Sequence, residues 1–171
     1  RFGDGSYRKF NLGQSSVRLT FDPVSIGVSN ENIWWGPGRR NSLLMSNNAP
    51  GFKHITLNTT RPVKTPIGSF EVQLFGGRLD SSGVPRPALP GYTKKPDDWR
   101  YISGFAATYS PRGLPNLFLG YERTNIAYQS LMQKGIRSYI PLFNGKEREA
   151  YNEDGSTDIS DSGRDHLIAF N

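Results

Sequence analysis

Hydrophobic and polar residues alternate with a period of two along several stretches of the chain. Residues 15–21 alternate, Asp22-Pro23 forms a short turn, and residues 24–29 alternate again. Such alternation predicts extended strands, and two runs joined by a short turn predict a hairpin. One face of this hairpin is apolar and the other carries small polar side chains. The apolar face fits the inside of a soluble sandwich and the lipid-facing side of a transmembrane barrel equally well.

A longer strand at residues 99–109 discriminates better between these environments. Trp99, Tyr101 and Tyr109 share one face of it, with apolar residues between them. At ~3.3 Å per residue the strand covers ~33 Å, which becomes roughly 25 Å of membrane at a tilt of about 40°. Aromatic residues at both strand ends match the girdles of outer-membrane barrels, and Tyr121 is predicted to join this aromatic girdle. The alternative is an aromatic-rich strand in an ordinary core.

The remaining runs extend the predicted sheet. Residues 54–60 and 68–79 alternate, and a further strand begins near Leu117. Long loops are predicted at 77–98, which contains four prolines, and at 144–163, which is polar and acidic. Short turns that alternate with long loops are typical of outer-membrane barrels.

Two short helical inserts are predicted between the strands. Leu43–Met45 fit one helical turn with Asn41 or Ser42 as its cap. Residues 126–134 fit a short helix capped by Asn125.

Composition supports a β protein. The 19 glycines, 12 prolines and an aromatic content of 12% favour many turns over long helices. Cysteine is absent, which excludes disulfides and thiolate metal sites. The sequence has no apolar run of about eighteen residues, so a transmembrane helix is excluded, whereas a transmembrane barrel is not.

Residues 33–62 hold the strongest candidate binding chemistry. Gly36-Pro37-Gly38 forces a sharp bend. Sugars are bound by aromatic rings against their C–H faces and by guanidinium and amide groups against hydroxyls, and acidic sugars also favour arginine. The structural alternative is that the tryptophans anchor a plug or lie at the membrane interface, and that the asparagines cap turns. The candidate polysaccharide-binding or plug residues are Trp34, Trp35, Arg39, Arg40, Asn41, Asn47 and Asn48.

The same stretch resembles the signature of the Wzi-type capsule assembly proteins. The resemblance is carried by residues 34–38 and 41–52, and it continues through residues 68–77, 99–109 and 164–166. It implies a bacterial outer-membrane β-barrel that acts as a lectin and holds capsular polysaccharide at the cell surface.

The expected fold is therefore all-β: part of a large antiparallel outer-membrane β-barrel with long extracellular loops and short helical inserts. A barrel of this family needs a longer chain, and both ends of this one look cut, so residues 1–171 are expected to form one partial domain, an internal fragment of the barrel. We expect residues 34–48 to leave the wall as an irregular insert at the mouth or within the lumen, because consecutive charges are too costly to expose to hydrocarbon.

Charge is distributed unevenly. Residues 1–141 hold 18 of the 21 basic and 8 of the 15 acidic residues, a net charge of +10, whereas residues 142–171 carry a net charge of −4. A basic body attracts polyanions such as acidic polysaccharide or lipopolysaccharide phosphate; scattered cations that keep loops soluble are the alternative. No basic run exceeds two residues, which argues against nucleic acid. The expected partners are capsular or other surface polysaccharide, outer-membrane lipid and lipopolysaccharide, and other outer-membrane proteins.

Catalytic chemistry is not indicated. His54 and His166 stand apart in the sequence, and the acidic residues of 144–163 miss the spacing of a calcium loop. Glu71 and Glu122 both fall on polar strand faces, where carboxylates that line a lumen explain them more simply than a glycosidase pair. We expect no enzyme activity, no metal and no cofactor.

Two other functions are compatible with the pattern. A passive porin or transport barrel would have an open, charged lumen without a plugging segment, and an accessory subunit of a surface complex is related to it. A soluble β-sandwich enzyme or binding module would instead place Val72 and Phe105 in a buried core.

Overall fold

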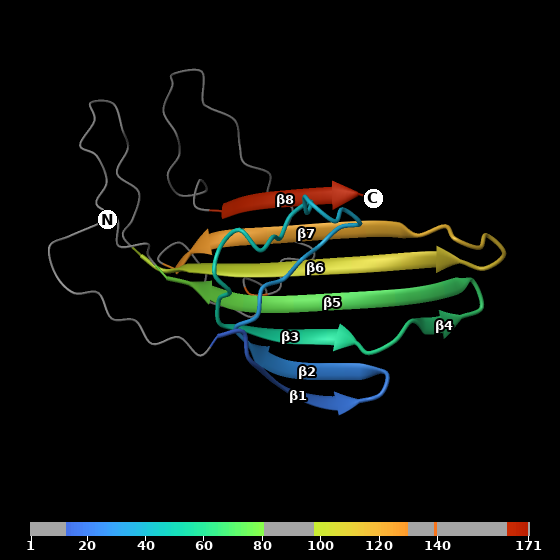
Figure 1. The fold of residues 1–171 in the computed structure, drawn as a ribbon, viewed down its shortest axis with the longest axis horizontal. Helices are drawn as coiled ribbons and strands as arrows, with labels where there is room; N and C mark the ends of the chain where they lie inside the picture. Colours follow the sequence, from blue (N-terminus) through green and yellow to red (C-terminus); the bar gives the residue numbers. More distant parts are fainter. Residues whose placement is uncertain (1–12, 81–97, 130–138, 140–163, 171) are drawn as a thin grey trace, which may run out of the picture.

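The structure is a computed structural model that describes residues 13–80, 98–129, 139 and 164–170. Its regular structure consists of strands that lie side by side (Figure 1). In chain order they are β1 (Ser16–Phe21), β2 (Val24–Ser29), β3 (His54–Thr59), β4 (Val63–Thr65), β5 (Gly68–Leu79), β6 (Arg100–Pro111), β7 (Leu119–Tyr128) and β8 (Arg164–Phe170).

All the strands belong to one antiparallel sheet. Its order is β1-β2-β3-β5-β6-β7-β8, and the short β4 pairs with the beginning of β5. The longest ladder joins β5 to β6, from Gly68 opposite Pro111 to Leu79 opposite Arg100. The prediction of antiparallel β architecture is confirmed, and so is the open edge, because the described strands do not close into a barrel.

Alternation gives the sheet two different faces. The face that we call the apolar face carries, in one cross-strand row, Leu19, Ile26, Leu57, Leu74 and Phe105. Phe105 is half-buried and is not part of the buried core cluster, contrary to what a soluble sandwich would require. The large exposed hydrophobic residues of this face are Val17, Leu19, Phe21, Val24, Ile26, Val28, Ile55, Leu57, Leu119, Ile168 and Phe170.

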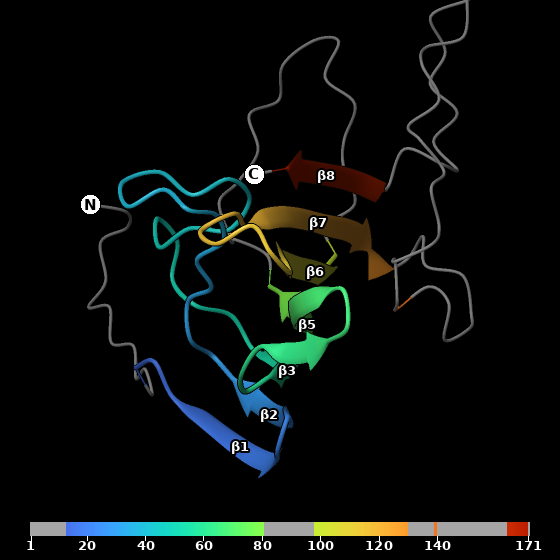
Figure 2. The same cartoon turned by 90° about the vertical axis from the view of Figure 1, so that its right-hand side faces the viewer.

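The opposite face is covered by residues 30–53, the connection between β2 and β3, which we call the covering segment. Figure 1 shows it crossing the sheet, and Figure 2 shows it on the concave side of the curved sheet. This covered face is where the core lies. The core cluster consists of Ile33, Trp35, Phe75 and Ile102, and Leu44, Met45, Phe52, Leu79, Ala106 and Ile126 pack around it.

The connections differ in length at the two ends of the sheet. The turns 22–23, 60–62 and 112–118 lie at one end of the strands. The covering segment and the connections 80–99 and 129–163 leave from the opposite end. The predicted asymmetry of short turns and long connections is therefore confirmed, although Gly77–Leu79 belong to β5 rather than to a loop.

The predicted helix at 126–134 is wrong at its start. Ile126–Tyr128 continue β7, because they pair with residues 100–102 of β6. Asn125 is a strand residue opposite Ser103, not a helix cap. Residues 130–134 lie outside the described part of the chain.

The predicted helical turn at Leu43–Met45 is also wrong. Leu43 N donates to the carbonyl of Trp35 (3.1 Å), and Trp35 N donates to the carbonyl of Met45 (3.3 Å). These backbone groups bond across a chain reversal instead of along a helix. Within the described residues no helix is long and apolar enough to cross a membrane.

Candidate functional site

The covering segment is fixed to the sheet at its first residues. The Glu31 carboxylate accepts hydrogen bonds from Ser29 Oγ and from Arg18 Nη2, both at 3.0 Å. Ser29 Oγ in turn accepts from Glu31 N at 2.9 Å. The hydroxyl of Ser29 and then the guanidinium of Arg18 hold the pKa of Glu31 below its usual value. The segment therefore starts from a charged contact with β1 and β2.

The sharp bend predicted at residues 36–38 is present. Gly36 has a φ of 101°, a conformation that favours glycine. A Cβ on Gly38 would collide with the Asn41 carbonyl, so only glycine fits this close approach. Trp34 Nε1 donates to the Gly38 carbonyl at 2.9 Å and closes the turn.

Trp35 is a packing residue. It is 4% exposed, and its ring lies 5.2 Å from that of Phe75 at an angle of 56°. Its Nε1 donates to Gln73 Oε1 at 2.8 Å, so the buried indole keeps a polar partner on β5. Gly104 on β6 leaves the space that both rings fill.

The other candidate residues face solvent. Trp34 is half-buried, whereas Arg39, Arg40, Asn41, Asn47 and Asn48 are exposed. Neither arginine belongs to an ion pair found among the described residues. The two tryptophans are thus separated: Trp35 packs on the sheet, and Trp34 stays beside a surface with two arginines and planar amides. The expectation that residues 34–48 leave the sheet is confirmed.

Glu71 and Glu122 lie in different surroundings. By register they are separated by strand β6 and by two residues along the sheet. Their backbones are therefore about 12 Å apart. Glu122 is 5% exposed and Glu71 is exposed, so they do not share an open cleft.

No group of three or more His, Cys, Asp or Glu side chains suited to a metal occurs in the described ranges. Residues 140–163, which include the predicted acidic loop 144–163, lie outside the described residues.

The four girdle residues lie at or near the apolar face. Tyr109 stacks on Phe70 at 4.6 Å near the end with short turns. Trp99 lies under the Arg78 guanidinium, 5.0 Å from its ring centre, and Tyr101 is near the same end of β6. Tyr121 is level with Ala107, two positions inside Tyr109. The aromatic side chains therefore gather towards both ends of the β5–β6 ladder.

Sequence reasoning missed the residues that hold the covering segment. Gln73 is on the polar side of a correctly predicted strand, but its partner Trp35 is 38 residues away. Arg18 and Glu31 are 13 residues apart and meet only because β1 and β2 fold back on each other. The hairpin register is the signal that could have brought the second pair together.

A family comparison agrees with this arrangement. The model of the family described as capsule assembly protein Wzi matches residues 4–161. The chain belongs to the Wzi family. The match confirms the resemblance carried by residues 34–52 and implies a role in capsule assembly. No curated protein and no solved structure matches this Wzi-family chain significantly.

Proposed function

We propose that this Wzi-family chain forms part of an outer-membrane β-barrel that binds capsular polysaccharide and holds it at the cell surface without catalysis. The observation that carries the proposal is the two-sided sheet. One face exposes a broad apolar surface, and the other is covered by a segment that presents arginines, amides and an indole.

The apolar face supports the placement in a membrane. Val17, Phe21 and Phe170 are all more than two-thirds exposed, which is unfavourable in water over so large a surface. Hydrocarbon is the solvent that suits such a face, and strands that alternate between lipid and lumen are the pattern of outer-membrane barrels.

The stagger of the sheet supports tilted strands. One cross-strand row of the apolar face runs from Val17 on β1 and Val28 on β2 to Ser103 on β6 and Asn125 on β7. Its side chains are apolar on β1 and β2 and polar on β6 and β7, so the apolar band begins further along the strands at the β6–β7 side. The short-turn end of the sheet is displaced in the same direction: β1 ends at Phe21, whereas the β5–β6 ladder continues beyond that row to Gly68 and Pro111. Both limits of the apolar band cross the rows obliquely, as they do when strands are tilted in a barrel.

The covering segment supports polysaccharide binding rather than free diffusion. It occupies the concave face, which would be the lumen side of a barrel, and would narrow the pore of a passive porin (Figure 2). Exposed Arg39 and Arg40 can pair with uronate or other acidic groups, and the half-buried ring of Trp34 can stack on a sugar. Lipopolysaccharide and other outer-membrane proteins are further partners of a wall in this position.

Replacement of both arginines tests the polysaccharide site. Arg39→Ala combined with Arg40→Ala is expected to weaken binding of the full chain to a uronate-containing capsular polysaccharide by at least about tenfold. The salt dependence of binding should fall as well, because two exposed charges are lost. Calorimetric titration in detergent micelles measures both effects.

The matched control removes two exposed arginines at the short-turn end, Arg61→Ala with Arg112→Ala, and should leave binding unchanged. A carboxyl-reduced polysaccharide should bind wild type weakly. If Arg39→Ala with Arg40→Ala binds as wild type does, or if the control loses as much affinity, the assignment to this segment is wrong.

A further inference from the structure

Two cations lie side by side at the border of the apolar face. Lys53 immediately precedes β3, and Arg78 is near the end of β5; Arg78 N donates to the Lys53 carbonyl at 3.0 Å. They lie two residues beyond the pair Ile55 and Gly76, and directly beyond the pair His54 and Gly77. Like charges on neighbouring strands repel each other. Asp80 contacts Arg78 at 2.7 Å, but Lys53 has no ion pair within the described part of the chain.

The two cations line a hollow in the apolar face. Its volume is about 580 Å³, and Val17, Val28 and Ile55 form its apolar side. The cations are therefore placed at the polar rim of a hydrophobic surface depression. Among the described residues that line this hollow, none is acidic.

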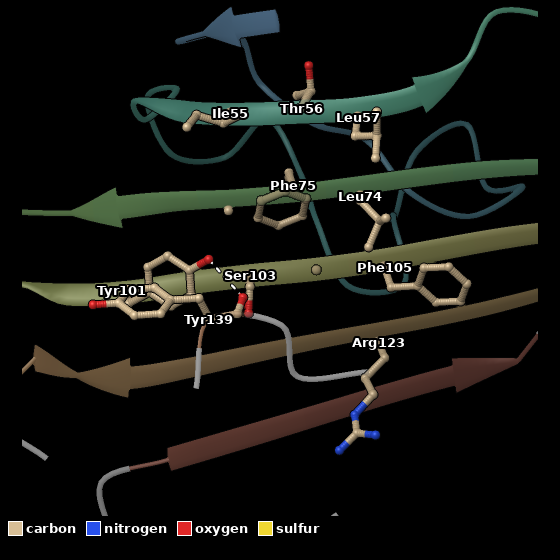
Figure 3. A pocket seen from close by; sticks show the side chains of 12 residues that line it. Ile55, Thr56, Leu57, Leu74, Phe75, Tyr101, Ser103, Phe105, Arg123 and Tyr139 are labelled. Atoms are coloured by element: carbon tan, nitrogen blue, oxygen red, sulfur yellow. Dashed lines mark hydrogen bonds between the residues drawn. The ribbon is translucent and has the colours of Figure 1, made fainter. Parts of the chain in front are cut away.

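A second hollow of about 450 Å³ adjoins the first (Figure 3). The two share Ile55, Gly76, Tyr101 and Tyr139, and the second continues over apolar residues of β3, β5 and β6. A Cβ on Gly76 would collide with the Tyr101 hydroxyl, so this glycine lets the tyrosine lie across β5. Tyr101 Oη donates to the Tyr139 carbonyl at 3.0 Å, which fixes the shared wall.

The second hollow is lined by a buried polar side chain whose hydroxyl lacks a hydrogen-bond partner. Ser103 lines it and is 1% exposed, yet its Oγ has no hydrogen-bond partner among the described residues. The neighbouring Asn125, opposite it on β7, also has a buried side-chain oxygen without a partner. Buried polar atoms are rarely left unpaired in proteins, so a bound polar group is expected here.

We propose that the two hollows bind one phosphorylated membrane lipid. Its phosphate lies between Lys53 and Arg78, its acyl chains lie along the apolar rows that contain Ile55 and Leu74, and a polar linkage of the lipid bonds Ser103. The charge of the rim and the apolar floor require an anionic amphiphile, since a free anion would leave the floor uncovered. This inference rests on the proposed placement in a membrane.

Retention of lipid by the full chain in nanodiscs tests the inference. The discs are made of phosphatidylcholine with a minor fraction of phosphatidylglycerol, and native mass spectrometry measures which lipids stay bound. Wild type is expected to retain phosphatidylglycerol preferentially. Lys53→Gln and Arg78→Gln should each weaken this preference about tenfold, the effect of losing one charge-assisted hydrogen bond.

The control is Lys64→Gln, an exposed lysine of β4 at the short-turn end, which should retain lipid as wild type does. Glycerol phosphate, which has the headgroup without chains, should not displace the lipid. Equal retention by wild type, Lys53→Gln and Arg78→Gln would overturn the lipid site while leaving the membrane placement intact. Displacement by glycerol phosphate would show a site for soluble anions, and failure of wild type to enter the discs would overturn both proposals.

Discussion

Replacing Gly104 with alanine measures how tightly the covering segment packs on the sheet. A Cβ at this position would lie 2.6 Å from Trp35 Cη2 and even closer to the Phe75 ring. Carbon atoms pack best at about 3.5–4.0 Å, so the rings must move by about 1 Å. Overpacking of this kind costs about 1–3 kcal/mol. The upper end is expected, because a shift of Trp35 also strains its hydrogen bond to Gln73.

Urea unfolding of the full chain in detergent micelles, followed by tryptophan fluorescence, provides the measurement. Gly104→Ala should lower the free energy of unfolding by about 3 kcal/mol. Trp35→Phe removes the collision with Trp35 Cη2 but leaves the one with the Phe75 ring, so the added cost of Gly104→Ala should be smaller, although not zero, in that background. If Gly104→Ala costs less than about 0.5 kcal/mol, the ordinary effect of a surface substitution, the covering segment does not pack as described.

Two further predictions concern charge. Because the pKa of Glu31 is lowered in the folded state, first by Ser29 and then by Arg18, these contacts stabilise the protein above the ordinary value of 4.5, and this stabilisation is lost as the pH falls through the folded-state pKa. Unfolding measured across acidic pH should therefore show declining stability that Glu31→Gln flattens, and an unchanged profile in that variant would contradict the assigned role. Ile26→Arg on the apolar face should lower stability in bilayers by about 2–4 kcal/mol, whereas Thr20→Arg on the opposite face should be tolerated; equal effects in a bilayer unfolding assay would argue against lipid contact.

The strands could be read from the sequence because a period of two is a local signal. Residues 16–21 and 24–29 needed no knowledge of the rest of the chain, and the same alternation gives them one apolar face. That this face is exposed is known only from the structure. Where a strand ends, however, depends on pairing with residues that are distant in the sequence. Ile126–Tyr128 fit a helix locally, but pairing with β6 keeps them extended. Long-range hydrogen bonds therefore overruled local propensity.

The candidate site was only partly readable for a similar reason. Trp34 and Trp35 were both candidates for binding or for packing, and the structure separates them: Trp35 is buried and Trp34 is half-buried. Which ring is buried depends on the space at Gly104 and on the acceptor Gln73, both far away in the sequence. The exposure of Arg39 followed from its charge, but the backbone reversal that presents it required contacts that no short motif encodes.

The two faces of this sheet require different surroundings, and the covering segment connects them. Its start is held by Arg18 on β1, and Trp35 packs on β5 and β6, so the segment spans the sheet rather than hanging from one edge. A pulling force that a bound polysaccharide exerts on Arg39 or Arg40 would be transmitted through the packed Trp35 to the central strands β5 and β6. On the proposed function, this is the arrangement that a polysaccharide anchor needs: the binding residues are exposed, while their support belongs to the buried core cluster of the covered face.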